Sequence, residues 1–242
     1  MKYLSLFIYL FILVTLTNCQ KSQDATNPDI TTDLVAYYPF SGNALDSSGN
    51  GFHGTLLGVI STTDRSGKSN SAFRFIGNNK IGIPALTPLN NAPKLTFSFW
   101  KRTTSVVNNY SRRMNVLNFG GKFVFNMGTM PLYKRDTIFI DNNQAYMAGS
   151  VKNDVGSWNH YAITYDASKK TCDFYYNGKF ASTNYLYSNR TDNFLFPVLS
   201  SADQCSIGPS MGSSPTEFDE LDEIRVFKRV LTADQIAFLA TR

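Results

Sequence analysis

One short loop near the start of the chain carries residue types that could hold a metal ion. Residues 46–51 read Asp-Ser-Ser-Gly-Asn-Gly. The glycines let the backbone turn tightly, so several side-chain and carbonyl oxygens can point at one spot, and calcium takes about six to eight such oxygens. We therefore expect Asp46 and Asn50 to contribute to a structural calcium site. In the alternative, Asp46 closes a turn by accepting hydrogen bonds from its own backbone, as loop aspartates often do.

Cys19 is the next residue whose position suggests chemistry. It follows Lys2 and an apolar run over residues 3–16, which is typical of a signal peptide and is shorter than the ~20 residues that span a bilayer. Leu16-Thr-Asn-Cys19 resembles the bacterial lipobox, whose cysteine is acylated, although Asn18 stands where a small residue is usual. We expect a lipoprotein signal peptide over 1–18, lipidation at Cys19 and a flexible tether over 19–32. Ordinary signal cleavage without a lipid is the alternative.

The other two cysteines, Cys172 and Cys205, form a pair in a chain that we expect to be exported. Because disulfides form in oxidising compartments, we expect a disulfide between them. Such a bridge would stabilise the fold by about 3–4 kcal/mol through loop closure. Two separately buried thiols are the alternative.

The composition indicates a β protein with a mild positive charge. Aromatic residues make up 14% of the 242 residues, in short alternating runs, and the formal net charge is +5. This excess is small, and the basic pairs at 101–102, 112–113 and 134–135 are typical of solvated strand ends, although they could touch an anionic glycan. The sequence therefore gives no indication of nucleic-acid binding.

Short runs rich in Val, Ile, Phe and Tyr, separated by Gly, Asn, Asp and Pro, predict a series of strands. The expected strands are 34–40, 72–75, 80–83, 95–102, 113–119, 122–127, 137–140, 158–165, 171–176, 206–207 and 220–227. Asn177-Gly178 predicts a tight hairpin, since it supplies the positive φ angles of a type I′ turn. The one expected helix covers 233–240, with Thr232 as its N-cap.

Three stretches of the chain, taken together, resemble one known family. They are the opening strand with its Asp-x-Ser-Gly-Asn-Gly loop (34–54), the paired strands around Tyr-Asn-Gly (158–179), and the closing Leu-Asp-Glu-Ile-Arg-Val-Phe strand (221–231). In this order and spacing they resemble the laminin-G-like, concanavalin A-like jelly-roll domains of bacterial surface proteins. The resemblance implies an all-β, two-sheet antiparallel jelly-roll sandwich with a short C-terminal helix, as a single domain over 33–242.

The resemblance adds a third residue to the expected calcium site and a test for catalysis. In a jelly roll the first and last strands lie together, which implies that Asp222 approaches Asp46 and Asn50. Glucanases with this fold carry Glu-x-Asp-x-Glu on one strand, because alternate residues share a face and retaining hydrolysis needs two carboxyl groups ~5–5.5 Å apart. Here Glu217 and Asp219 are followed by Leu221, and a register bulged by one residue from Glu220 reaches Arg225. The trio is missing in every register.

We therefore expect a binding module at the bacterial outer membrane or cell surface, whose partner is a polysaccharide or a surface protein. A glycoside hydrolase with a non-standard carboxylate pair and an adhesive, protein-binding domain are the alternatives. Sugar sites use exposed aromatic side chains, and the sequence offers several tyrosines without ranking them. These are Tyr110, Tyr133, Tyr146, Tyr185 and Tyr187.

Overall fold

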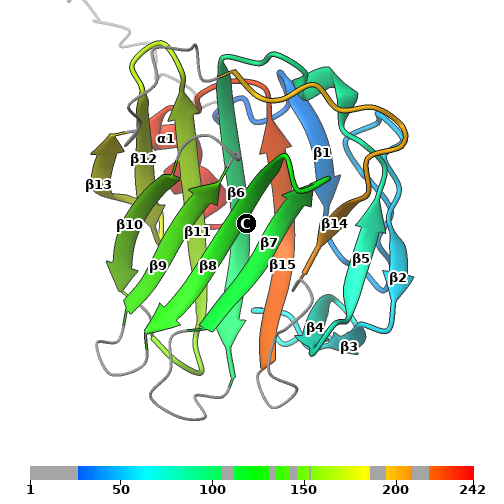
Figure 1. The fold of residues 1–242 in the computed structure, drawn as a ribbon. Helices are drawn as coiled ribbons and strands as arrows, with labels where there is room; N and C mark the ends of the chain where they lie inside the picture. The colour runs from blue at the N-terminus through cyan, green and yellow to red at the C-terminus, as the bar shows by residue number, and fades with distance from the viewer. Residues whose placement is uncertain are drawn as a thin grey trace, which may run out of the picture.

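The structure, a computed structural model, describes residues 27–104, 112–130, 135–141, 146–152, 154–185, 195–208 and 218–242. Two antiparallel sheets face each other and a short helix lies outside them (Figure 1). The elements are β1 (Leu34–Tyr38), β2 (Thr55–Leu57), β3 (Ile60–Thr62), β4 (Ala72–Ile76), β5 (Lys80–Ile83), the 3₁₀ turn Thr87–Leu89, β6 (Lys94–Thr103), β7 (Arg112–Phe119), β8 (Phe123–Met130), β9 (Arg135–Asp141), β10 (Tyr146–Lys152), β11 (Trp158–Asp166), β12 (Thr171–Tyr176), β13 (Lys179–Tyr185), β14 (Cys205–Ile207), β15 (Phe218–Phe227) and α1 (Ala233–Leu239). The predicted all-β sandwich with one C-terminal helix is confirmed.

The strand order is that of a jelly roll, in which strands distant in sequence become neighbours. The eight-stranded sheet has the order β13-β12-β11-β6-β15-β4-β3, with β1 also paired to β15. The seven-stranded sheet, in front in Figure 1, has the order β10-β9-β8-β7-β14-β5-β2. The last strand, β15, therefore lies at the centre of its sheet, between β6 and β4.

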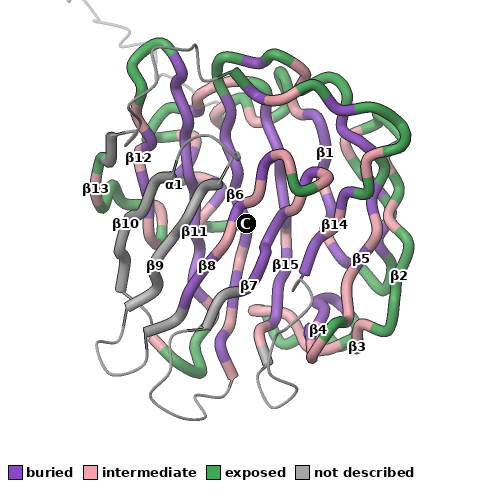
Figure 2. Tube along the Cα trace, viewed as in Figure 1, coloured by how far each residue is buried: buried purple, intermediate pink, exposed green. Residues whose placement is uncertain are grey.

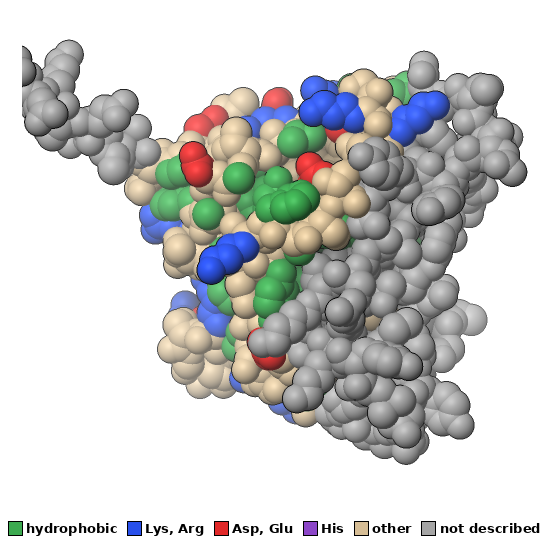
Figure 3. All heavy atoms as spheres, turned by 90° about the vertical axis from the view of Figure 1, so that its left-hand side faces the viewer, with side chains coloured by type: hydrophobic (Ala, Val, Ile, Leu, Met, Phe, Trp, Pro, Cys, Tyr) green, Lys and Arg blue, Asp and Glu red, His purple; other side chains and the backbone are tan. Residues whose placement is uncertain are grey.

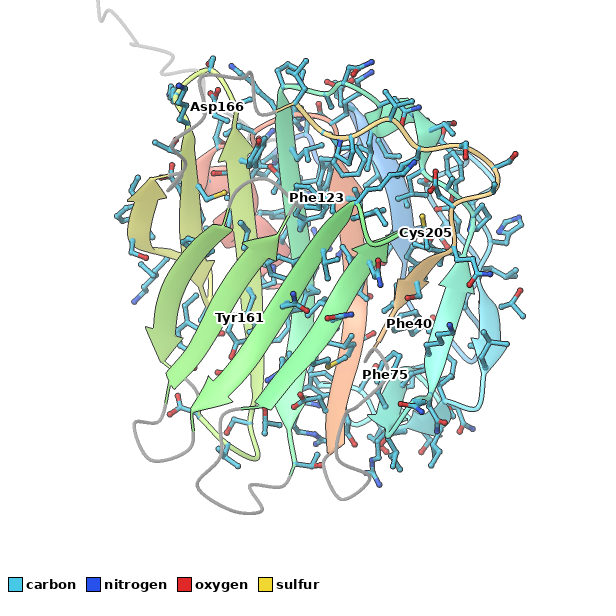
Figure 4. The ribbon with its side chains drawn as sticks, viewed as in Figure 1. Phe40, Phe75, Phe123, Tyr161, Asp166 and Cys205 are labelled. Atoms are coloured by element: carbon cyan, nitrogen blue, oxygen red, sulfur yellow. The ribbon has the colours of Figure 1, made fainter. Side chains whose placement is uncertain are left out.

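The core forms because the side chains of each strand alternate between two faces. On β6, Leu95, Phe97 and Phe99 point inward and are fully buried. Phe97 meets the ring of Phe125 on β8 with centroids 5.9 Å apart. Figure 2 shows the buried residues concentrated where the two sheets face each other, and in Figure 4 the side chains of Phe123 and Tyr161 lie in this layer. The outward side chains of β6 are thereby left for other roles.

The hairpin and the helix form as the sequence predicts. Asn177 and Gly178 have φ angles of 47° and 76° between β12 and β13. Thr232 caps α1 in a capping box with Gln235, so both partners satisfy backbone N–H groups that the helix leaves open. Ile236 and Leu239 are buried on the outer face of the eight-stranded sheet, together with Ala162, Tyr175 and Phe227.

Three strands and part of the expected tether differ from the sequence predictions. The sequence patterns did not indicate β2, β3 or β10, and they implied β13 only through the hairpin at Asn177-Gly178; β2 and β3 are short edge strands with mostly exposed residues. Asp29, placed in the tether, is held by the domain: its carbonyl oxygen accepts hydrogen bonds from Arg229 and Gln235 at 2.9 and 2.6 Å. No helix among the described residues is long and apolar enough to cross a membrane.

The expected disulfide is not formed in the structure, which corrects that prediction. Within the described residues, Cys172 and Cys205 are both buried thiols. Cys172 lies on β12 near one end of the eight-stranded sheet, whereas Cys205 lies on β14 of the other sheet, toward the opposite side of the molecule (Figures 1 and 4). A disulfide requires Cα atoms within ~7 Å, which this placement does not provide.

Candidate functional site

A bulge in the central strand β15 marks the outer face of the eight-stranded sheet. Asp222 pairs with Trp100 of β6 and Arg225 pairs with Ser98, so two residues of β15 stand opposite the single Phe99. The extra residue, Glu223, has a φ of 57°. Seven described residues other than glycine have positive φ angles, and Glu223 alone among them lies inside a strand. Such a conformation costs on the order of 1–3 kcal/mol, and strain of this kind clusters at functional sites.

The bulge changes which side chains face outward. Ile224 points into the core and is fully buried, while Glu223 on the bulge joins Arg225 on the outer face. The Glu223 carboxylate accepts a hydrogen bond from the Tyr37 hydroxyl at 2.8 Å and pairs with Arg225 at 2.7 Å. The Arg225 guanidinium lies 3.9 Å from the centroid of the Tyr37 ring. Burial raises the pKa of Tyr37, so the hydroxyl stays protonated and remains a donor to Glu223.

These three residues line one side of a surface hollow of about 640 Å³. Phe238 of α1 and Arg242 line it as well, with the Arg242 guanidinium 4.3 Å from the Phe238 ring centroid. Residues 27–31 form the remaining wall. The volume falls within the ~300–1,000 Å³ of sites that bind small molecules. We call Tyr37, Glu223, Arg225 and this hollow the bulge site.

Beside the bulge site, cross-strand pairing builds a layer of arginines and tryptophans. Arg74 of β4, Glu220 of β15, Arg102 of β6 and Trp158 of β11 are successive partners across four strands. Asp222, Trp100 and His160 form the next row. The Arg102 and Arg65 guanidinium groups each lie 5.0 Å from a tryptophan ring centroid, over Trp158 and Trp100 respectively. We call Arg65, Arg74, Arg102, Trp100 and Trp158 the arginine–tryptophan layer.

Two buried carboxylates lie beneath these arginines. Glu220 accepts hydrogen bonds from Arg74 at 2.8 and 2.9 Å and from Arg102 at 2.5 Å. Asp222 accepts one from Arg65 at 2.9 Å, yet burial, together with the negative charge of the nearby Glu223, raises the pKa of Asp222 to about 7. Burial lowers the pKa of His160 to about 3, with Arg225 and Arg65 adding to the effect. His160 is therefore neutral, and its Nε2 meets the Ser98 hydroxyl at 2.8 Å.

The residues expected to bind calcium have other partners. Each Asp46 oxygen is met by two donors: Oδ1 by the N–H groups of Tyr37 and Ser48, and Oδ2 by the Ser48 hydroxyl and the Phe52 N–H. Although burial opposes it, these bonds hold the pKa of Asp46 below its usual value. The Asn50 amide donates to the carbonyl of Leu34. This is the turn-closing role that the sequence left open as an alternative.

The geometry therefore does not fit a calcium ion. A carboxylate offers about four acceptor positions, and those of Asp46 are taken, while Asp222 is paired with Arg65. No group of three or more His, Cys, Asp or Glu side chains arranged to hold a metal is found in the part of the chain that the structure describes. Calcium binding stays a prediction from the sequence alone.

Glu220 and Asp222, the carboxylates that share the outer face of the acidic strand, are paired with arginines, and Asp219 lies on the opposite face. Asp219 lies beside Lys101, with 3.3 Å between its Oδ1 and the Lys101 Nζ, whereas Glu220 faces the arginines on the other side. The structure adopts the register with one bulged residue, and this register places Arg225 where a glucanase would need the last carboxylate of its trio. Glu217 and Cys19 lie outside the described residues.

Sequence reasoning missed Tyr37 and Glu223. The five tyrosines considered for sugar binding cannot be compared with them, because the side chains of Tyr110, Tyr133, Tyr146, Tyr185 and Tyr187 lie outside the described residues. The acidic strand carried the available signal, because its alternating pattern, with one residue inserted, places Arg225 on the same face as the preceding carboxylates. Nothing in the sequence around Tyr37 distinguished it from the buried Tyr38.

Apolar surface is the other feature that a binding protein can use. Figure 3 shows apolar side chains on the side of the molecule that carries β13 and α1, with charged side chains around them. Phe180 of β13 is 58% exposed there and packs its ring edge-on against Tyr175. These side chains are few, and Phe180 does not line the hollow of the bulge site.

Comparison with known proteins identifies a family model that the sequence matches. Residues 54–237 match the family model described as the concanavalin A-like lectin/glucanases superfamily. No curated protein matches the sequence.

Solved structures match over most of the chain at low identity. The receptor-binding domain of botulinum neurotoxin C/D mosaic serotype has a TM-score of 0.67 at 13% identity, with 88% of this chain and 52% of that chain covered. The binding domain of Paraclostridial Mosquitocidal Protein 1 has 0.67 at 18% identity, with 88% and 52% covered. The binding domain of botulinum neurotoxin DC, solved in complex with rat synaptotagmin II, has 0.65 at 13% identity, again with 88% and 52% covered. The chain spans about half the length of these structures.

Proposed function

The chain belongs to the concanavalin A-like lectin/glucanase superfamily, and from this premise we propose that it is a cell-surface binding module that recognises carbohydrate at the bulge site. The observation that carries the proposal is Glu223, held at a φ of 57° inside a central strand where it lines a hollow. A strained residue persists only when its surroundings enforce it. The bulge thereby places the Glu223 carboxylate, whose side chain is 15% exposed, in the wall of the hollow.

The chemistry of the bulge site suits a sugar. Glu223 offers carboxylate oxygens to sugar hydroxyls and Arg225 offers N–H donors, while Tyr37 and Phe238 provide apolar ring surface beside them. Their mutual contacts fix the orientations before a ligand arrives, which lowers the entropic cost of binding. Three solved structures with this fold are binding or receptor-binding domains, which supports a binding role for the fold without naming a ligand for this chain.

The proposal also includes a lipid anchor. The apolar residues 3–16 and Cys19 support export and acylation at the cell surface, and the segment after them reaches the domain at Asp29, beside the bulge site. Mass spectrometry of bacterial membrane fractions tests the anchor: it should find an acylated Cys19 as the first residue. Retention of residues 1–18, or an unmodified Cys19, would contradict it.

A glycan array comparing the native protein with the Glu223→Gly variant tests the binding site. Glycine adopts positive φ without strain, which offsets part of the roughly 3–5 kcal/mol that leaving the buried Arg225 unpaired costs, so the variant should stay folded and lose its glycan signal. Asn70→Gly is the matched control, because Asn70 has a φ of 58° in an exposed loop away from the hollow. An unchanged signal in Glu223→Gly would exclude the bulge site. Silence of the native protein on glycans, with capture of a surface protein, would replace carbohydrate by a protein partner.

A further inference from the structure

We propose that the arginine–tryptophan layer is a second binding surface, separate from the bulge site, that takes an acidic polysaccharide bearing carboxylate or sulfate groups. The inference rests on the proposed function in taking the ligand to be a glycan. It adds the chemical class of that glycan and the residues that select it.

On this surface the positively charged side chains are more exposed to solvent than the negatively charged ones. The side chains of Arg74, Arg102 and Arg65 are 37%, 24% and 21% exposed, whereas those of Glu220 and Asp222 are 0% and 2% exposed. A molecule that approaches the sheet therefore meets guanidinium groups, with their carboxylates beneath them. This asymmetry makes the surface attractive to anions although the ion pairs are nearly balanced in number.

The arginines are also held in position before any ligand binds. Glu220 fixes two of them, and Asp222 fixes Arg65 from the row next to it. Arg102 and Arg65 lie over tryptophan rings, an arrangement that guanidinium groups favour because they are planar and weakly hydrated. Planar guanidinium groups recognise carboxylate and sulfate-like oxygens in pairs, and side chains that are already ordered lose less entropy on binding.

The spacing favours a polymer over a single small anion. Arg74 and Arg102 flank β15, so their backbones are two strand spacings apart, roughly 9–10 Å. Arg65 extends the surface to the neighbouring row through its bond to Asp222. Because Arg74 and Arg102 converge on Glu220, one acidic group can meet both of them, and a second acidic group of the same chain can meet Arg65 in the next row.

Binding measurements with defined probes test the proposal. Isothermal titration of the native protein should detect polygalacturonate and dextran sulfate but show much weaker binding of uncharged dextran, and raising the salt concentration should weaken the acidic interaction. Arg65→Gln should lower the affinity for the acidic polymers about 5- to 10-fold, the loss expected for one charged contact. Lys122→Gln is the control, because Lys122 is 42% exposed in the β7–β8 turn of the other sheet.

A second variant shows whether a loss of binding results from misfolding. Arg65→Gln combined with Asp222→Asn removes both members of the ion pair and leaves neither as an unpaired buried charge, so it should fold and show the same loss. Equal binding of acidic and neutral polymers, or native affinity in both Arg65 variants, would overturn the proposal. Binding to phosphatidylglycerol vesicles without binding to the soluble polymers would overturn it as well, since the ligand would then be a membrane. Arg65→Gln should keep the array signal of the bulge site, so failure of one site is distinguishable from failure of the other.

Discussion

The two ends of the outer face of the eight-stranded sheet are built from the same strands and have opposite character. At the helix end, the outward residues of β11 and β15 include Ala162 and Phe227, and α1 buries Ile236 and Leu239 against them. At the other end, the same strands and β6 present Trp158, Arg102 and Glu220. Alternation fixes only which residues face the core. The outward positions can therefore close one end with apolar contacts and equip the other for binding.

We call the helix end of this face, which α1 covers, the closed end. The largest expected effect tests it. Leu239→Ala removes a fully buried side chain and should lower the free energy of unfolding by about 2–5 kcal/mol, measured by urea denaturation. Phe180→Ala, on the exposed neighbour strand β13, should cost less than about 1 kcal/mol. The loss in Leu239→Ala should not depend on salt. A loss as small as that of Phe180→Ala would mean that α1 is not held by apolar burial.

The closed end was the more predictable of the two from sequence. Thr232 followed by apolar residues at helical spacing indicates a capped amphipathic helix, and Asn177-Gly178 indicates the hairpin whose turn meets it. Gly178 lies so close to α1 that an added Cβ would be 3.0 Å from the Cα of Ala237. These signals are local, because each depends on residues a few positions apart.

The other end of this face, which presents Trp158, Arg102 and Glu220, is the open end. It could not be predicted in the same way. Its rows depend on the register between strands far apart in sequence, and on one bulge that moves Arg225 onto the face of Asp222. Asp46 and Asp222 illustrate the limit. The sequence could not distinguish a carboxylate that backbone donors surround from one that a distant arginine covers. The two carboxyl groups are accordingly shifted in opposite directions, since the pKa of Asp46 is lowered and that of Asp222 is raised.

The second expected effect tests these opposite pKa shifts. The pKa of Asp222 rises from 3.8 to about 7 on folding, so between these values the folded protein binds a proton that the unfolded chain releases. Its contribution to stability is therefore complete below pH 4 and is lost as the pH rises through 7. Asp222→Asn lacks this titration. Relative to the variant, the native protein should lose roughly 2–4 kcal/mol between pH 4 and pH 8.

Denaturation curves of both proteins at pH 4, 5, 6, 7 and 8 measure this difference. Asp46→Asn gives the contrasting case, since a carboxyl group whose pKa is lowered on folding contributes stability above its unfolded value and loses it in acid. If the native protein gained stability over Asp222→Asn as the pH rose, the ion pair with Arg65 would outweigh burial. The open end would then be a stabilising element of the fold and less plausible as a surface prepared for ligands.

The smallest expected effect concerns the border between the two ends. The Thr232 hydroxyl accepts a hydrogen bond from Gln235, whose side chain also bonds the Asp29 carbonyl beside the bulge site. Thr232→Ala should cost about 1 kcal/mol in thermal or urea denaturation, and Thr232→Ser should restore most of it. Because apolar burial holds the rest of α1, polysaccharide binding at the arginine–tryptophan layer should not change. A loss equal to that of Leu239→Ala would instead show that the cap positions the helix and that the two ends are coupled through it.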